Sequence, residues 1–150
     1  MQLQQFLPYR LALLADAVSR SMAAVYHQRF ELSRDEWRLL ATLGGAGRVQ
    51  AAEAAQLTTL DKMQASRALR SLQARGLVER QPDERDRRHV IVQLLPAGRA
   101  LLRQLQPMVL AREAYLLEAL DEAERAVLDR ALDKLLQRAY AVAADFAQLD

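Results

Sequence analysis

The side chains best suited to chemistry gather between residues 61 and 90, where positive charge is concentrated. This stretch holds eight basic and five acidic side chains, a net charge of +3, while the whole 150-residue chain carries only +2. Guanidinium, ammonium, amide and hydroxyl groups hydrogen-bond to phosphates and to base edges, so this composition favours contact with nucleic acid. The candidate contacts are Lys62, Met63, Gln64, Ser66, Arg67, Arg70, Arg85, Arg87 and Arg88.

Other kinds of chemistry lack the residues that they need. The chain has no cysteine and only two histidines, His27 and His89, which excludes thiol catalysis, disulfides and thiolate zinc sites. No nucleophile paired with a base, phosphate loop or metal-ligand cluster is recognisable, so we expect no enzyme, no metal and no cofactor. No run approaches the ~20 apolar residues of a membrane span, and no signal-peptide pattern is seen, so we expect a cytoplasmic protein.

A helix over residues 62–75 is predicted to position most of the candidate contacts. Asp61 and Gln64 have the spacing of a capping box, and Gly76 suits the residue after a helix end. At 3.6 residues per turn, four apolar side chains share the face toward the core: Ala65, Ala68, Leu69 and Leu72. The opposite face offers arginine and glutamine to base edges and serine and lysine to phosphates.

A charged hairpin is predicted directly after this helix. Residues 77–80 and 89–94 have the composition of strands, and the polar loop over 82–88 joins them. A pair of short helices followed by such a hairpin is typical of proteins whose second helix enters the major groove of DNA. The arginines at the hairpin tip suit the narrow, negative minor groove of A·T-rich DNA.

The rest of the chain is predicted to be helical. Apolar residues recur every three or four positions over 3–25, 96–120 and 121–146, and the capping box of Ser33 and Glu36 starts a helix that ends near Leu43. A short helix is expected over residues 49–57. We therefore expect a mainly α fold with a small β-hairpin wing, and we interpret the long stripes at both ends as dimerisation helices.

The order of these motifs resembles a known signature. From Leu60 to Gly98 the chain reads LDKMQASRALRSLQARGLVERQPDERDRRHVIVQLLPAG, and this stretch resembles the MarR family (multiple antibiotic resistance regulators). The matching segments are Leu60-Asp61-Lys62, Ser66-Arg67-Ala68, Gly76-Leu77-Val78-Glu79-Arg80, Asp86-Arg87-Arg88 and the exit from Leu94 to Gly98. The resemblance implies one domain over 1–150, with a winged helix-turn-helix lobe over 33–95 and dimerisation helices over 1–30 and 96–150.

The same resemblance implies a homodimer on a pseudo-palindromic operator in double-stranded DNA. Asp86 is expected to brace the wing against an arginine of the recognition helix, and Arg88 to reach the minor groove. Three positions depart from the family pattern: Thr59 replaces the usual turn glycine, Leu95 replaces the usual capping threonine, and Ala65 replaces a more common valine.

Arg10 lies on the apolar stripe of the first helix, where a charge needs a partner. One interpretation is a snorkelled side chain or an ion pair within the dimer. The other is a site for the carboxylate of a small aromatic or phenolic acid, with Trp37 as an aromatic wall and Tyr26 and His27 as polar contacts. The resemblance implies an effector pocket between the dimerisation helices and the DNA-binding lobe.

These observations predict a DNA-binding repressor that a small molecule releases from its operator. An activator or dual regulator of the same family fits the sequence as well, because the direction of regulation depends on where the operator lies. A helical dimer that serves as an adaptor without binding DNA is the remaining alternative, and the set formed by Gln64, Arg67 and Arg88 argues against it.

Overall fold

The computed structural model describes residues 2–147, and the side chains as far as residue 143. After a short 3-10 turn (Leu3–Gln5) the elements are α1 (Leu7–Phe30), α2 (Arg34–Ala46), β1 (Val49–Gln50), α3 (Ala51–Leu57), α4 (Lys62–Ala74), β2 (Val78–Pro82), β3 (Val90–Leu94), α5 (Pro96–Leu117) and α6 (Glu122–Ala147). They form two compact units, Met1–Arg112 and Glu113–Asp150. The predicted winged helix-turn-helix fold is confirmed.

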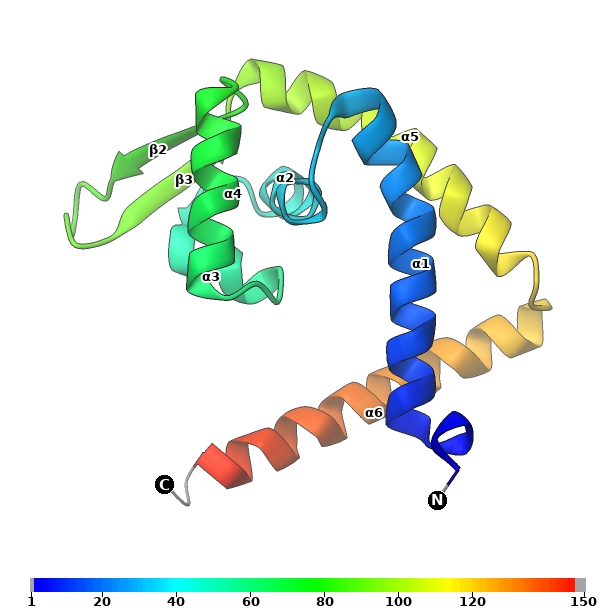
Figure 1. Ribbon diagram of the computed structural model, residues 1–150. Helices are drawn as coiled ribbons and strands as arrows, with labels where there is room; N and C mark the ends of the chain where they lie inside the picture. The colour runs from blue at the N-terminus through cyan, green and yellow to red at the C-terminus, as the bar shows by residue number, and fades with distance from the viewer. Residues whose placement is uncertain (1, 148–150) are drawn as a thin grey trace. The chain divides into compact units, whose positions relative to one another are not determined.

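The core of the first unit lies where α2, α4 and the sheet meet (Figure 1). Seven side chains there are less than 2% exposed: Leu39, Leu40, Leu43, Leu69, Leu72, Val78 and Val92. Burying a side chain of this size stabilises a fold by about 1.5–3 kcal/mol. The core therefore fixes α4 against α2 from behind and leaves its opposite face to solvent.

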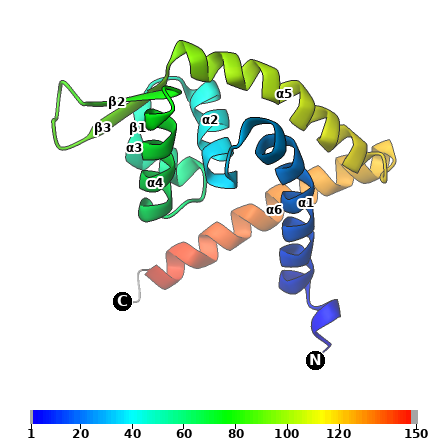
Figure 2. The same ribbon diagram turned by 45° about the horizontal axis from the view of Figure 1, so that its top comes forward.

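The sheet has three antiparallel strands in the order β1-β3-β2, one more than the sequence predicts. The predicted third helix begins at Ala51, because Val49 and Gln50 pair instead with Val92 and Ile91 of β3. Val49 buries its β-branched side chain in this pairing. The hairpin of β2 and β3 extends from the lobe, as Figure 2 shows from a second side.

Both predicted capping boxes of the first unit are present. The Ser33 hydroxyl accepts from the Glu36 N–H at 3.1 Å, and the Glu36 carboxylate accepts from the Ser33 N–H at 2.7 Å. The box of Asp61 with Gln64 has the same form at the start of α4. A satisfied cap contributes about 1 kcal/mol, so these short local patterns define where both helices begin.

Two more helix boundaries, the start of α1 and the end of α2, differ from the prediction. The first helix begins at Leu7 rather than Leu3, with Pro8 in its first turn, where the missing N–H of proline leaves no hydrogen bond unmade. Helix α2 continues through Gly44 and ends at Ala46, and its C-cap residue Gly47 has a φ of 76°. A Cβ on Gly44 would collide with the side chain of Leu102, so this glycine allows α5 to approach α2 rather than ending the helix.

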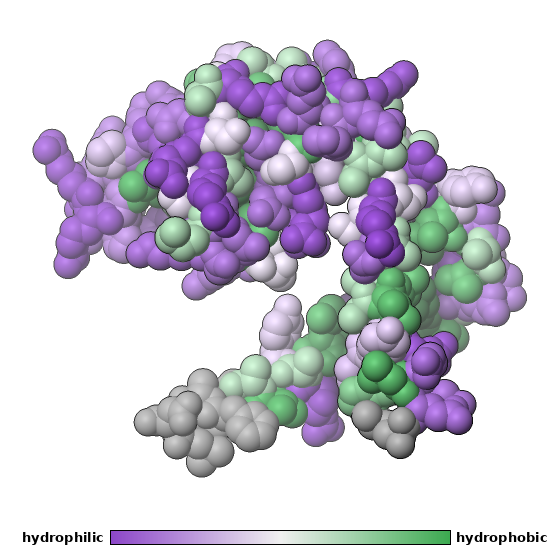
Figure 3. Space-filling model, viewed as in Figure 1, coloured by the Kyte–Doolittle hydropathy of each residue, from purple (hydrophilic) through white to green (hydrophobic). Residues whose placement is uncertain are grey.

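The long helices carry apolar side chains that the described structure leaves uncovered. On α1, Leu7, Leu11 and Leu14 are 47%, 39% and 56% exposed. Figure 3 shows hydrophobic side chains along the lower part of α1, whereas the winged lobe is mainly hydrophilic. In the second unit, α6 starts with a capping box of Asp121 and Glu124, and its Leu132 and Leu136 are exposed. None of the described helices has the length and hydropathy of a membrane span.

Candidate nucleic-acid interface

Helix α4 presents two chemically distinct faces. The four apolar side chains predicted to face the core are buried: Ala65, Ala68, Leu69 and Leu72. The predicted contacts lie elsewhere on the helix, with Lys62, Met63, Arg67 and Arg70 exposed and with Gln64 and Ser66 half-buried. Lys62, Arg67 and Arg70 have no hydrogen bond or ion pair to other described residues, so their charges are available to a ligand.

Gln64 has a second task at the start of α4. Its Oε1 accepts from the Asp61 N–H at 3.1 Å, while the Asp61 carboxylate accepts from the Gln64 N–H at 2.7 Å. A bidentate contact of glutamine with adenine uses Oε1 as acceptor and Nε2 as donor. The cap uses one of the two lone pairs of Oε1 and fixes the direction of the amide, so Nε2 is the group of Gln64 that is wholly free for a base.

The wing is braced within itself. The carboxylate of Asp86 accepts a bifurcated hydrogen bond from Arg88 Nε, at 2.9 and 3.1 Å, and a second one from Arg88 Nη2 at 2.7 Å. It also accepts from the Arg88 backbone N–H at 3.1 Å. The prediction that Asp86 pairs with an arginine of α4 is therefore wrong. Its partner in the described structure is Arg88, two residues later in the same turn. Arg85 and Arg87 are exposed, and their guanidinium groups have no partner among the described residues.

This contact changes the acidity of both groups. The Arg88 side chain, followed by its backbone N–H, lowers the pKa of Asp86 below its ordinary value. The hydrogen bonds to Asp86 raise the pKa of Arg88 above its ordinary value. Both groups thus stay ionised at neutral pH, and Arg88 keeps Nη1 free while its other nitrogens are held.

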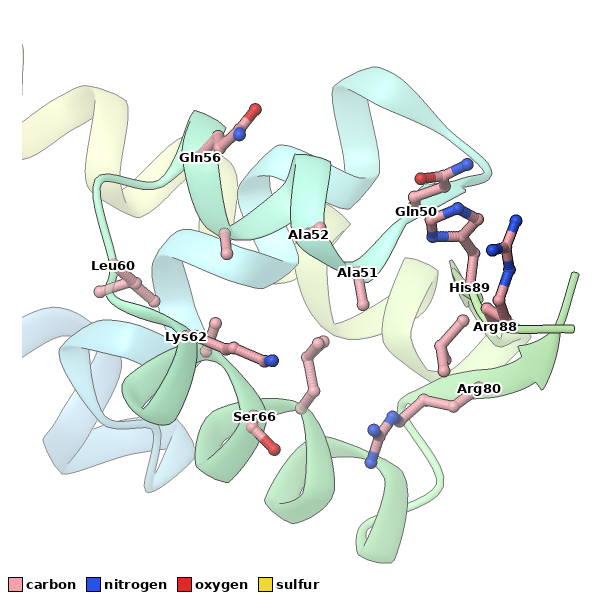
Figure 4. A pocket seen from close by; sticks show the side chains of 14 residues that line it. Gln50, Ala51, Ala52, Gln56, Leu60, Lys62, Ser66, Arg80, Arg88 and His89 are labelled. Atoms are coloured by element: carbon pink, nitrogen blue, oxygen red, sulfur yellow. The ribbon is translucent and has the colours of Figure 1, made fainter. Parts of the chain in front are cut away.

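A hollow of about 550 Å³ lies between α3, α4 and the base of the wing (Figure 4). Its polar lining is basic or neutral and contains no carboxylate: Gln50, Gln56, Lys62, Ser66, Arg80, Arg88 and His89. The Arg80 Nε atom is buried without a hydrogen-bond partner in the described structure. The cationic side chains that line this hollow, Lys62, Arg80 and Arg88, are donors suited to an anion such as a phosphate group.

Sequence reasoning missed Arg80, although a signal for it exists. Side chains alternate across a strand, so Arg80 lies on the same face of β2 as the buried Val78. A charged residue in register with a core valine has to be directed toward a partner or a ligand. His89, the residue before β3, also lines the hollow, and nothing in the sequence around it pointed to this position.

The four effector candidates do not form one site within the described chain. Tyr26 is buried and stacks on Trp37, with ring centroids 6.2 Å apart and planes inclined by 15°. Trp37 also lines an apolar hollow of about 340 Å³ between α2 and α5, while His27 and Tyr26 line a different hollow of about 290 Å³ beside the start of α2. Arg10 is exposed and lies about 24 Å from Tyr26 along the axis of α1.

Histidine and carboxylate side chains are dispersed in the part of the chain that the structure describes. No group of three or more histidine, aspartate or glutamate side chains converges there as a metal site would require. The arrangement as a whole offers cationic donors on α4, in the hollow and at the wing tip.

Comparison with known proteins gives a consistent result. A sequence model of the MarR family matches residues 30–89, from the end of α1 to the residue before β3. A MarR-family transcriptional regulator from Silicibacter pomeroyi is 27% identical, with a TM-score of 0.77 and 91% of each chain covered. Among curated protein sequences no significant match is found.

Two further structures share the fold at lower identity. MarR of Escherichia coli in complex with operator DNA is 24% identical, with a TM-score of 0.79 over 87% of this chain and 93% of its own. BpsR of Bordetella bronchiseptica, whose DNA binding is regulated by 6-hydroxynicotinic acid, is 23% identical, with a TM-score of 0.80 over 88% of this chain and 94% of its own.

Proposed function

We propose that the chain is a MarR-family transcriptional regulator and that it binds an operator in double-stranded DNA as a homodimer. Helix α4 enters the major groove, and the wing lies over the adjacent minor groove. The observation that carries this proposal is the exposed, unpaired basic face of α4 beside the cationic hollow and the arginine-tipped wing. A regulator of this kind acts where the DNA is, so we also propose a cytoplasmic location.

The uncovered apolar faces support a second copy as the partner. On α1 the exposed leucines recur at positions 7, 11 and 14, and on α6 at positions 132 and 136. Contiguous exposed apolar patches on a folded protein mark interaction surfaces. A two-fold dimer built through these helices presents two copies of α4, and they fit half-sites about one helical turn, 34–36 Å, apart.

The free side chains of α4 indicate which bases a half-site contains. Arg67 and Arg70 have open guanidinium groups, which pair best with the O6 and N7 atoms of guanine. Gln64 is the residue type for adenine, but its Oε1 is committed to the helix cap. We therefore propose guanine in the half-site core, with A·T-rich flanks where Arg88 reaches the minor groove.

Binding-site selection on random DNA, followed by a salt series on the selected site, tests this function. Specific binding is expected to weaken steeply with salt. Arg67→Ala is expected to relax the preference at one base position by about 1–3 kcal/mol. Arg34→Ala removes the same charge from an exposed site at the start of α2 and serves as the control. If the selection yields no preferred sequence, the adaptor alternative is favoured. If Arg67→Ala lowers affinity equally for all sequences, Arg67 contacts a phosphate and not a base.

The wing has a separate expected signature. Arg88→Ala is expected to weaken binding most on operators with A·T-rich flanks, because a narrow minor groove attracts arginine most strongly. If Arg88→Ala lowers affinity equally for operators with A·T-rich and G·C-rich flanks, Arg88 does not bind in the minor groove.

We further propose that the protein is a repressor released by a small aromatic or phenolic acid. The apolar hollow beside Trp37 is lined by Leu102, Val109 and Leu110, and it has room for one ring. A protein of the same fold, BpsR, responds to 6-hydroxynicotinic acid, and this motivates the choice of ligands to be tried. The cation that would bind the carboxylate of the effector is not among the residues that line this hollow. Arg10 lies far from it in the same subunit, so an Arg10 contact would have to come from the second copy.

Trp37 is the only tryptophan, so its fluorescence reports on ligands at this hollow. Titration with a panel of aromatic acids is expected to quench this fluorescence and to release the operator probe in parallel. Arg10→Ala distinguishes the two earlier interpretations of that residue, because only an effector contact weakens the response. Acids that neither quench Trp37 nor release DNA from the wild type would contradict the effector proposal. Release that lowers transcription of the adjacent gene would indicate an activator.

A further inference from the structure

Arg75, the last residue of the recognition-helix segment, reaches across to the end of α1. Its Nη2 donates to the Phe30 carbonyl at 2.8 Å, and its Nη1 donates to the Glu31 carbonyl at 3.2 Å. A helix leaves its last carbonyls without partners, and a cation there is favoured by the helix dipole. Glu31 has a left-handed φ of 53°, which ends α1 and turns these carbonyls out of the helix.

The same guanidinium approaches the start of α2. Arg75 Nη1 lies 4.0 Å from Glu36 Oε2, and the Glu36 side chain is only 9% exposed. Glu36 accepts from the Ser33 N–H in the capping box, and Arg75 is its cationic partner among the described residues. A buried carboxylate without a cation is strongly destabilising, so this pair has a structural reason to persist. Arg75 thus joins the end of α4 to the end of α1 and the start of α2.

This junction has no counterpart elsewhere along α4 within residues 2–147. The two bonds from Arg75 are the only hydrogen bonds there that connect α4 with α1 or with the turn that ends it. The packing of α2 on α4 is apolar and broad, whereas α1 packs against the core only over residues 22–30, where Val25 and Tyr26 are buried. A directional contact with two carbonyls at the end of this segment restrains the angle between α1 and α4.

We propose that Arg75 is a positioning residue that sets the distance between the two DNA half-sites. The proposal rests on the proposed function, in which α1 is a dimerisation arm and α4 reads DNA. Helix α1 has 24 residues and is about 36 Å long. A rotation of only ~5° at its lobe end displaces the far end by about 3 Å, close to the 3.4 Å rise of one base pair. Loosening the contact of Arg75 with the end of α1 should therefore allow the dimer to bind a wider range of half-site spacings.

The test is a series of operators that contain two half-sites selected by the wild-type dimer, with the spacer varied in steps of one base pair. The wild type is expected to show a sharp optimum. Arg75→Ala is expected to lose about tenfold at that optimum and less than about threefold one base pair away, so that the profile flattens. Sequence preference within a single half-site is expected to remain unchanged, because Arg75 does not lie on the base-facing part of α4.

Three further variants separate positioning from folding and from charge. Arg75→Lys keeps the charge but replaces the fork with one ammonium group, so an intermediate profile is expected. Arg75→Gln keeps one hydrogen-bond donor without the charge, and it replaces the alanine variant in this test if that variant folds poorly. Arg34→Ala removes one positive charge near the same junction, where Arg34 has no hydrogen bond or ion pair to the described residues of α1 or α4, and it is expected to keep the sharp optimum.

The outcomes distinguish this inference from the function beneath it. A wild-type protein that selects no sequence contradicts the proposed function itself. A wild type with a sharp optimum, together with an Arg75→Ala profile that falls uniformly at every spacing or stays sharp at a temperature where the variant is fully folded, overturns the positioning role. A flattened profile with an unchanged half-site preference supports it.

Discussion

The turn between α3 and α4 contains a threonine in a conformation that suits glycine. Thr59 has a φ of 58°, the left-handed region that β-branched residues rarely adopt. Its N–H donates to the Gln56 carbonyl, and the Leu60 N–H donates to the Ala55 carbonyl, both at 3.2 Å. This is the Schellman pattern, in which glycine is the usual residue at the left-handed position. We expect Thr59→Gly to stabilise the protein.

The size of the gain follows from two opposing terms. The left-handed conformation costs an L-residue with a Cβ about 1–2 kcal/mol. Glycine avoids this strain but gains freedom in the unfolded chain, which offsets about 0.4–1 kcal/mol. The Thr59 side chain is exposed and makes no hydrogen bond in the described structure, so no contact is lost. The expected net gain is about 0.5–1 kcal/mol, or ~1–4 °C in Tm for a domain of this size.

Chemical unfolding at fixed protein concentration measures this change, because the stability of a dimer depends on concentration. Thr59→Ala is the matched control: it removes the hydroxyl and the branch but keeps the Cβ, so less than half of the gain is expected. Thr58→Ala has the opposite sign, since the buried Thr58 hydroxyl donates toward the Ala54 and Ala55 carbonyls at 2.8 and 2.9 Å. If Thr59→Gly is no more stable than Thr59→Ala, the strain argument is refuted.

Two other predictions concern the wing and the start of α5. The pKa of Asp86 is lowered mainly by the Arg88 side chain, so the brace persists at every pH above the ordinary carboxyl range and is lost as pH falls through the lowered value. Amide hydrogen exchange of the wing should therefore be equally protected at pH 7 and pH 5, whereas Asp86→Asn should lose that protection at pH 7; equal protection in both proteins would contradict the brace. A Cβ on Gly98 would collide with the Leu77 carbonyl, so Gly98→Ala should destabilise by about 1–3 kcal/mol. Gly45→Ala, which has open space in α2, should instead stabilise by about 0.5–1 kcal/mol, and calorimetry that ranks the two alike would refute the packing argument.

The predictable parts of the fold are those that local sequence determines. The capping boxes at Ser33 and Asp61 form within four residues, so their spacing alone identified two helix starts. Strand β1 could not be found in this way, because two residues become a strand only when β3, some 40 positions later, pairs with them. Gly44 misled for a related reason: its role is to admit Leu102 of a distant helix, which no local pattern reveals.

In the candidate interface, too, the features that depend on local sequence were predictable and the contacts between distant segments were not. The faces of α4 follow from helical periodicity, and burial of Leu69 and Leu72 agrees with it. The hydrogen bonds and ion pairs between distant segments could not be predicted, because the sequence shows which charged side chains exist but not which of them are already paired. Arg10 is the plainest case: it shares a helix with Tyr26, yet the helical rise places it far from the hollow beside Trp37.

The number of satisfied charges also limits how strongly salt can affect binding. Of the eight basic side chains in residues 61–90, Arg75 binds helix carbonyls, Arg88 is paired with Asp86, and Arg80 is half-buried in the hollow. Five exposed cations remain without partners in the described structure: Lys62, Arg67, Arg70, Arg85 and Arg87. If these five contact phosphates and Arg88 enters the minor groove in each subunit, a dimer releases about twelve counterions, and the slope of log K against log salt is expected near −11. A steeper measured slope would mean that further cations such as Arg80 bind DNA, and Arg80→Gln would then reduce the slope by about two per dimer.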